Sequence, residues 1–257
     1  MNKPFGIEPR VFFTLLLACL MGFLAAIPYA LTVQAQALQK LTGRVPQLLV
    51  IQFLVSAATS ALAIGTGLRL QQKLPFFRFA LLGQTADVAR HDRSSVLRSG
   101  ALGGGIAFGL IGGLSWLIDR ILGALPLASP VAAPALWKGM LASFYGAINE
   151  EVLLRLLVMT GIAFGLAKLA GRVGLSERAI VWPAILLAAF VFGVGHLPAA
   201  LGAGLRLTAG VVTRLLLLNM AGGVVFGLLY WRRGFESAVV AHFVADLCLH
   251  VLVPWLR

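Results

Sequence analysis

Residues 136–169 have the sequence LWKGMLASFYGAINEEVLLRLLVMTGIAFGLAKL, an apolar stretch interrupted by two adjacent carboxylates, Glu150 and Glu151, and by Arg155. A helix of about 20 apolar residues is enough to cross the hydrocarbon core of a bilayer. An ionisable group at that depth costs roughly 2.5 to 3.5 kcal/mol on insertion scales, so three of them indicate a function or buried partners. Glu151 and Arg155 are four residues apart, share a helix face and can pair.

The composition of the whole chain is that of a membrane protein. Of its 257 residues, 60% are hydrophobic and 12% are charged, and the mean hydropathy is +0.94. These values exclude an ordinary soluble domain. The sequence predicts seven apolar spans: Val11–Gln34, Gln47–Leu68, Gly100–Leu122, Leu136–Leu169, Ala179–Leu197, Leu207–Tyr230 and Phe235–Leu256.

The fourth span is too long for one perpendicular helix. It must be tilted, broken near Gly161 or Gly165, or divided into two elements. We therefore predict an all-α fold, a polytopic transmembrane helix bundle of about seven or eight spans.

The chain is expected to form one integral membrane domain, residues 1–257, with two different parts. Residues 1–135 should contain the first spans and an interfacial loop, residues 69–99, whose aromatic and basic first part suits the membrane surface. Residues 136–257 should contain the helices that carry the catalytic motifs. Close helix packing is predicted at two glycine series with GxxxG spacing, Gly105/Gly109/Gly113 and Gly223/Gly227.

The net charge of +12 indicates topology before it indicates nucleic-acid binding, because lysine and arginine gather on the cytoplasmic side of membrane proteins. With the N-terminus in the cytoplasm, thirteen basic residues fall inside and six fall outside or at span ends. We therefore expect a cytoplasmic N-terminus. The expected location is the bacterial inner membrane, with the lipid bilayer as a partner and with no nucleic-acid partner.

Two later spans also carry ionisable residues. Phe192 precedes His196 by four residues, and His242 precedes Asp246 by four residues, so each pair shares a helix face. Alone, a transmembrane histidine is usually a hydrogen-bonded packing residue, and Glu151 with Arg155 can be merely a buried ion pair. Three helices that carry such groups separately would each bear a desolvation cost. Convergence on one polar site is therefore predicted.

The motifs Glu-Glu-x3-Arg, Phe-x3-His and His-x3-Asp, in this order, resemble the CPBP family of intramembrane glutamic endopeptidases, which includes CAAX proteases and bacteriocin-processing enzymes and is also called the Abi family. The resemblance extends from Trp137 to Leu249. It implies intramembrane proteolysis by an activated water. The implied substrate is a membrane-embedded or lipid-anchored peptide, and no cofactor is implied.

The resemblance also implies roles for single residues. Glu150 would be the general base, assisted by His196, and His242 with Asp246 would stabilise the oxyanion. Glu151 belongs to the same catalytic set. The supporting residues would be Arg155 and Phe192.

The chain departs from the family pattern at two positions. Asp246 stands where some members have asparagine, and Leu156 follows the arginine where glycine is common. An ionised Asp246 would repel an oxyanion, so it must either be protonated or orient His242. These alternatives remain open at the level of the sequence.

Other functions are also compatible with a buried polar cluster. Glu150, His196, His242 and Asp246 could ligate a metal such as zinc, although the chain lacks His-Glu-x-x-His. A non-catalytic membrane partner, an immunity-type protein or a proton-coupled carrier are further alternatives. Transport predicts polar residues along a path and often a repeat, and the sequence shows neither.

Overall fold

The structure is a computed structural model that describes residues 8–41, 43–83, 86–123, 134–171 and 174–256, with the backbone alone at residues 86–92, 122 and 170. Within these ranges every regular element is a helix. Seven helical segments are long and apolar enough to cross a membrane: Pro9–Val33, Val45–Gln71, Arg93–Ile121, Leu136–Leu169, Glu177–Gly202, Ala209–Arg233 and Phe235–Trp255. The predicted all-α bundle is confirmed.

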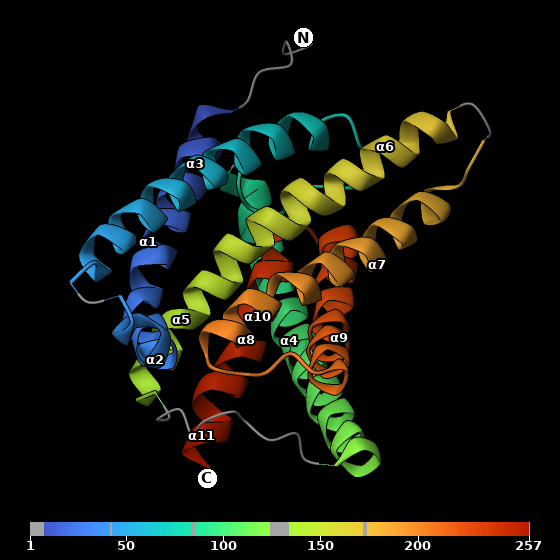
Figure 1. Cartoon of the computed structure of the whole chain (residues 1–257). Helices are drawn as coiled ribbons and strands as arrows, with labels where there is room; N and C mark the ends of the chain where they lie inside the picture. The colour runs from blue at the N-terminus through green and yellow to red at the C-terminus, as the bar shows by residue number, and fades with distance from the viewer. Residues whose placement is uncertain (1–7, 42, 84–85, 124–133, 172–173, 257) are drawn as a thin grey trace.

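The N-terminal half consists of α1 (Pro9–Val33), α2 (Ala35–Gln39), α3 (Val45–Gln71) and α4 (Ala86–Leu122). The second half consists of α5 (Leu136–Tyr145), the π-helical η1 (Gly146–Glu150) and η2 (Val152–Met159), α6 (Thr160–Ala170), α7 (Glu177–Gly195), α8 (Leu197–Gly202), α9 (Ala209–Arg233), α10 (Phe235–Leu247), the π-helical η3 (Cys248–Leu252) and α11 (Val253–Trp255). The two ends of the chain lie at opposite ends of the bundle (Figure 1).

Local sequence signals set several helix boundaries. Proline at the first turn begins α1 and α3, where its missing N–H group is not needed. The side chains of Ser176 and Thr208 accept hydrogen bonds from the first turns of α7 and α9 and so cap these helices. Gly234, with a φ of 104°, makes the sharp turn from α9 into α10.

The fourth span is one inclined helix. The elements α5, η1, η2 and α6 follow one another and run obliquely across the bundle in Figure 1. A helix of 34 residues is far longer than the roughly 30 Å of hydrocarbon, so inclination is the expected accommodation. Among the predicted alternatives, the structure has the tilted helix.

The prediction of an interfacial loop over residues 69–99 is wrong in its extent and in its surroundings. Helix α3 continues to Gln71 and α4 already begins at Ala86, because the polar run before Gly100 contains no glycine or proline. The connection between them turns inward. Phe77 and Phe79 are buried, and their rings lie against Tyr230 and Phe235, respectively.

The two glycine series differ in how closely other helices pack against them. A Cβ added at Gly105, Gly109 or Gly113 would meet nothing within 4 Å, so the predicted packing at this series is wrong. The second series does pack closely: a Cβ at Gly223 would lie 2.9 Å from Ala189 Cβ, on α7. On α4, the close contacts with α9 and α10 are made instead by Gly100, Gly103 and Gly104.

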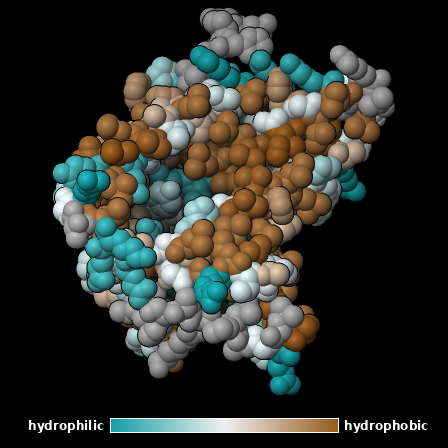
Figure 2. All heavy atoms as spheres, in the orientation of Figure 1, coloured by the Kyte–Doolittle hydropathy of each residue, from teal (hydrophilic) through white to brown (hydrophobic). Residues whose placement is uncertain are grey.

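The core is built from α1, α3, η2, α7, α9 and α10, with η2 in the middle of the bundle. Large hydrophobic side chains also remain exposed on the outside, among them Phe13, Leu54, Ile106 and Trp116. Figure 2 shows hydrophobic residues over much of one face. This surface is the one expected of helices that face lipid.

Candidate active site

The three sequence motifs meet inside the bundle. Glu151 lies between η1 and η2, and its Oε1 is 2.8 Å from Nδ1 of His242 on α10. The ring of His242 stacks on Phe226 of α9 at 4.5 Å and meets Phe192 of α7 edge-on at 5.5 Å. The predicted convergence of the fourth, fifth and last spans is thus present in the structure.

Glu151 and Arg155 form the buried base of the site. Both side chains are at most 1% exposed, and Arg155 Nε is 3.2 Å from Glu151 Oε2. These two atoms lie outside hydrogen-bond geometry, so the contact is one of opposite charges. Arg155 Nη2 donates to the carbonyl oxygen of Gly223 at 2.9 Å, and the guanidinium lies over the rings of Phe192 and Phe226.

Glu150 and Asp246 face the other nitrogen of the same histidine. His242 Nε2 is 3.6 Å from Glu150 Oε2 and 3.7 Å from Asp246 Oδ2. Unlike Glu151, these two carboxylates are partly open, with side chains 22% and 16% exposed. One ring nitrogen of His242 is therefore enclosed with Glu151, and the other faces a partly exposed space between two carboxyl groups.

His196 stands next to this space at the corner between α7 and α8. Its Nδ1 is 2.8 Å from the carbonyl oxygen of Phe192, and its ring meets the Phe192 ring edge-on. Because a carbonyl oxygen only accepts, Nδ1 carries a proton and Nε2 is left to accept one. His196 interacts electrostatically with Glu150 without forming an ion pair within 4 Å.

Several site residues were missed by the sequence analysis. Asn149 is buried, and its Nδ2 donates to the carbonyl oxygen of Cys19 in α1 at 3.0 Å, which ties α1 to η1. Gly146 lies against the opening, because an added Cβ would contact Asp246 Oδ2 and lie 3.3 Å from His242 Nε2. A polar residue beside the glutamate pair was the available signal for Asn149, and Gly146 lay in a stretch of small residues.

The π-helical geometry of this span is a second unpredicted feature. Glu150 ends η1, Glu151 follows it, and Val152 begins η2. Turns with hydrogen bonds five residues apart are rare and are frequent at functional sites. Here they set the directions in which the two adjacent carboxylates leave the helix.

Metal ligation was the alternative use predicted for these residues. Within the part of the chain that the structure describes, no three or more His, Cys, Asp or Glu side chains are grouped so as to hold a metal ion.

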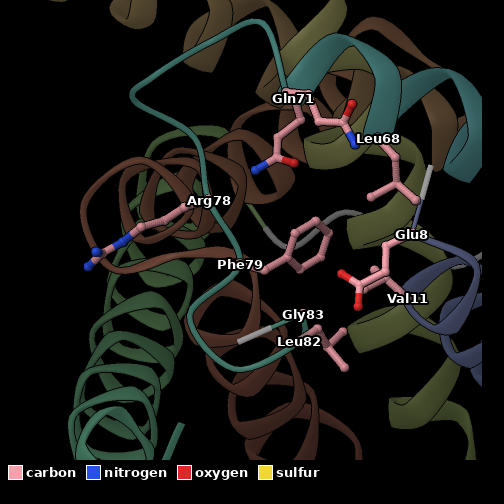
Figure 3. A pocket seen from close by; sticks show the side chains of 9 residues that line it. Glu8, Val11, Leu68, Gln71, Arg78, Phe79, Leu82 and Gly83 are labelled. Atoms are coloured by element: carbon pink, nitrogen blue, oxygen red, sulfur yellow. The ribbon is translucent and has the colours of Figure 1, made fainter. Parts of the chain in front are cut away.

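A separate cavity of about 210 Å³ lies at the first residues of α1 (Figure 3). It is bordered by Glu8 and Val11, by the end of α3, and by Phe79 to Gly83. Arg78 also borders it, but its guanidinium points away from the other labelled side chains in Figure 3. None of the motif residues lines this cavity, so it is distinct from the site of Glu150.

Comparison with known families agrees with this geometry. Residues 132–248 match a family described as Rce1-like, type II CAAX prenyl endopeptidase Rce1-like. Comparisons with curated proteins and with solved structures gave no match. The matched segment contains every residue from Glu150 to Asp246 that converges in the bundle. Residues 132–248, a little under half of the chain, are therefore similar to a family of CAAX prenyl endopeptidases.

Proposed function

We propose that this protein is an intramembrane endopeptidase that hydrolyses a peptide bond of a membrane-embedded or lipid-anchored peptide with a water activated by Glu150. The observation that carries the proposal is the division between the two glutamates. Glu151 is enclosed with Arg155 and His242, whereas Glu150 is partly exposed beside His242 Nε2. A general base must reach both water and substrate, and of the two glutamates only Glu150 is partly exposed.

In the proposed reaction, Glu150 accepts a proton from water while the water oxygen attacks the carbonyl carbon of the scissile bond. His196 Nε2 helps to orient this water from the other side of the opening. The carbonyl π electrons move to oxygen, and the resulting oxyanion is stabilised by donors from His242 and Asp246. Glu150 then returns the proton to the amide nitrogen as the C–N bond breaks, which releases an acid and an amine.

The contact between Glu151 and His242 favours one of the two roles for Asp246. Glu151 already accepts a hydrogen bond from Nδ1 of His242, which fixes the ring direction, and in the imidazolium form of His242 the proton on Nε2 is the donor to the oxyanion. An orienting carboxylate is therefore in place without Asp246. We assign Asp246 the role of a protonated donor to the oxyanion, next to His242 Nε2.

The rival functions make different demands on the same residues. A carrier needs polar groups that continue from one side of the membrane to the other. Beyond Arg155, the side chains toward the start of α1 are largely apolar and buried, including Met159, Phe77 and Phe79. A non-catalytic or immunity-type partner would keep the site as structure alone, and the experiment below distinguishes it.

The decisive experiment compares the wild type with Glu150→Gln in membranes from cells that lack the native protein. Peptides that gain a new terminus only with the wild type are expected, because glutamine keeps the shape of the side chain but cannot accept the proton. Glu177→Gln, at the start of α7, is the matched control and should cleave normally. Equal cleavage by wild type and Glu150→Gln would overturn the proposed function.

A further inference from the structure

We propose that the substrate reaches Glu150 from the extracytoplasmic side, so that the scissile bond belongs to a peptide exposed on, or anchored in, the outer leaflet. This inference rests on the proposed function and adds the direction of access to it. We call the end of the bundle at which α1 begins and α3, α6 and α9 end its N-terminal end. The C-terminal end is the opposite one, with α2, α8 and α11.

The N-terminal end of the site is sealed by side chains. Moving from Arg155 toward that end, Thr160 Oγ1 binds the carbonyl oxygen of Arg155 at 2.9 Å and the hydroxyl of Tyr230 at 3.0 Å. The Tyr230 ring stacks on Phe77 at 4.6 Å. Thr160 and Tyr230 are 0% exposed, and Phe77 is 3% exposed. These buried side chains therefore fill the bundle between Arg155 and its N-terminal end.

The connection between α3 and α4 is fastened over this seal. The Glu236 carboxylate, at the start of α10, accepts hydrogen bonds from the backbone N–H groups of Ala80, Leu81 and Leu82 at 2.7 to 2.9 Å. The N–H of Phe235 donates to the carbonyl oxygen of Arg78. Hydrogen bonds to a carboxylate are among the stronger ones in proteins. These bonds hold the connection in place between the buried Tyr230 and the cavity that Glu8 and Gly83 border at this end of the bundle.

The C-terminal end of the site is polar and partly open. This end has the side chains of Glu150, Asp246 and His196. Tyr29 follows them and interacts electrostatically with Asp246. The Tyr29 hydroxyl oxygen is 3.4 Å from His250 Nδ1. All of these side chains are partly exposed. Increasing exposure and polarity in this direction indicate where water enters.

The lightly packed helix α8 borders the same end. It begins next to His196, and Leu201 on it is 56% exposed. Its last residue, Gly202, lies beside the side chain of Gln34 at the end of α1. A peptide that enters here passes His196 before it reaches Glu150.

The distribution of basic residues gives the two ends their sides of the membrane. The N-terminal end has Arg10, Arg69, Lys73, Arg78, Arg93, Arg98, Lys168, Arg178, Arg232 and Arg233. The C-terminal end has Lys40, Arg44, Arg120, Lys138 and Arg206, and Arg214 is paired there with Asp119. Arg90 of the predicted inside set lies in α4 near the same end as Arg93, where the backbone alone is described. Lys3 and Arg172 of that set, and Arg257 of the outside set, lie outside the described residues. The positive-inside rule therefore directs the sealed end to the cytoplasm and the open end outward.

Thiol labelling tests this direction without any assay of cleavage. In a Cys248→Ala background, Glu150→Cys should react with a membrane-impermeant methanethiosulfonate in spheroplasts and be protected in inverted vesicles. Cys19, which is 0% exposed, remains as an internal unreactive control. Leu201→Cys and Arg93→Cys, both exposed and at opposite ends, report the orientation of the protein in each preparation. If Glu150→Cys does not fold, Tyr29→Cys takes its place.

The possible results separate two questions. Reaction of Glu150→Cys from outside, with Leu201→Cys reactive outside and Arg93→Cys reactive only in inverted vesicles, supports the proposal. Reaction from the cytoplasmic side, or from neither side, overturns it and leaves the proposed proteolysis standing. Conversely, a Glu150→Gln variant that still cleaves defeats the proposed function whatever the labelling pattern shows.

Discussion

Glu151 binds His242 across the bundle, with Oε1 2.8 Å from Nδ1, while its other oxygen, Oε2, faces Arg155. The second glutamate of the motif therefore joins two helices that are 91 residues apart in the chain. It holds the ring whose opposite nitrogen faces Glu150. Glu151 thus positions His242, whereas Glu150 is the partly exposed glutamate of the pair.

This division predicts unequal stability losses for the two glutamine variants. Glu151→Gln removes the negative charge next to the buried Arg155, and breaking a buried pair costs about 3 to 5 kcal/mol of unfolding free energy. Glu150→Gln should unfold close to the wild-type temperature, because its carboxyl is partly exposed and lies 3.6 Å from His242 Nε2, whereas Glu151 is 2.8 Å from Nδ1 and also faces Arg155. Thermal unfolding in detergent measures both. Equal melting temperatures would contradict the assignment.

Asp246→Asn should retain most of the proteolytic activity. An amide can donate to an oxyanion, and His242 stays oriented because Glu151 holds its Nδ1. His242→Ala should lose activity by orders of magnitude, since both the donor and the packing on Phe226 disappear. Initial cleavage rates of the two variants provide the comparison. An inactive Asp246→Asn with a normal melting temperature would mean that Asp246 works as a carboxylate.

Gly146→Ala should inactivate the enzyme while leaving it folded. The added methyl would contact Asp246 Oδ2 and lie 3.3 Å from His242 Nε2, inside the space that the substrate carbonyl needs. Displacement of a reacting group by about 1 Å can cost roughly a hundredfold in rate. Gly105→Ala is the matched control on another span, because a Cβ there meets nothing within 4 Å. Loss of activity in both variants would remove the steric explanation.

Glu236→Gln should loosen the seal at the N-terminal end. The carboxylate accepts three backbone hydrogen bonds, and a neutral amide with one oxygen cannot replace them all. Amide hydrogen exchange should accelerate at residues 80–82, with a stability loss of about 1 to 3 kcal/mol. Glu177→Gln, which loses only a bond from Trp231 Nε1, should leave exchange at these residues unchanged. Unchanged exchange in Glu236→Gln would show that the segment is held by its aromatic contacts alone.

The parts of the site that follow helix periodicity could be predicted from the sequence. Glu151 and Arg155 are four residues apart, so their pairing follows from helix geometry. The approach of His242 followed only from the cost of leaving charged groups unpaired in an apolar environment. That argument does not distinguish whether Glu150 or Glu151 makes the hydrogen bond with His242 Nδ1. The choice depends on the π-helical turns, for which the sequence has no comparable signal.

The failures have a common physical origin in the membrane environment. Hydrophobicity cannot tell a lipid-facing side of a helix from a protein-facing side, because lipid tails are as apolar as leucine. Gly105 therefore had the spacing of a packed glycine and faces outward, whereas Gly104 packs on α10. For the same reason, Phe77 and Phe79 suited the membrane surface as well as the core. Their burial depends on Tyr230 and Phe235, more than 150 residues later in the chain.

The π-helical turns of η1 and η2 also affect which mutations the protein tolerates in this span. A π turn accommodates a residue that an α-helix would have to loop out, so the catalytic span holds its register through its residue count. Deleting one residue between Val152 and Met159 would let this segment relax to an α-helix. The part that follows it, including Thr160, would keep its orientation, because the lost residue is the one that the π turn accommodates. A residue deleted from a regular α-helix instead turns everything beyond it by about 100°. We infer that a single-residue deletion is better tolerated between Val152 and Met159 than in the α-helical α6, although the two deletions alter the hydrophobicity equally little.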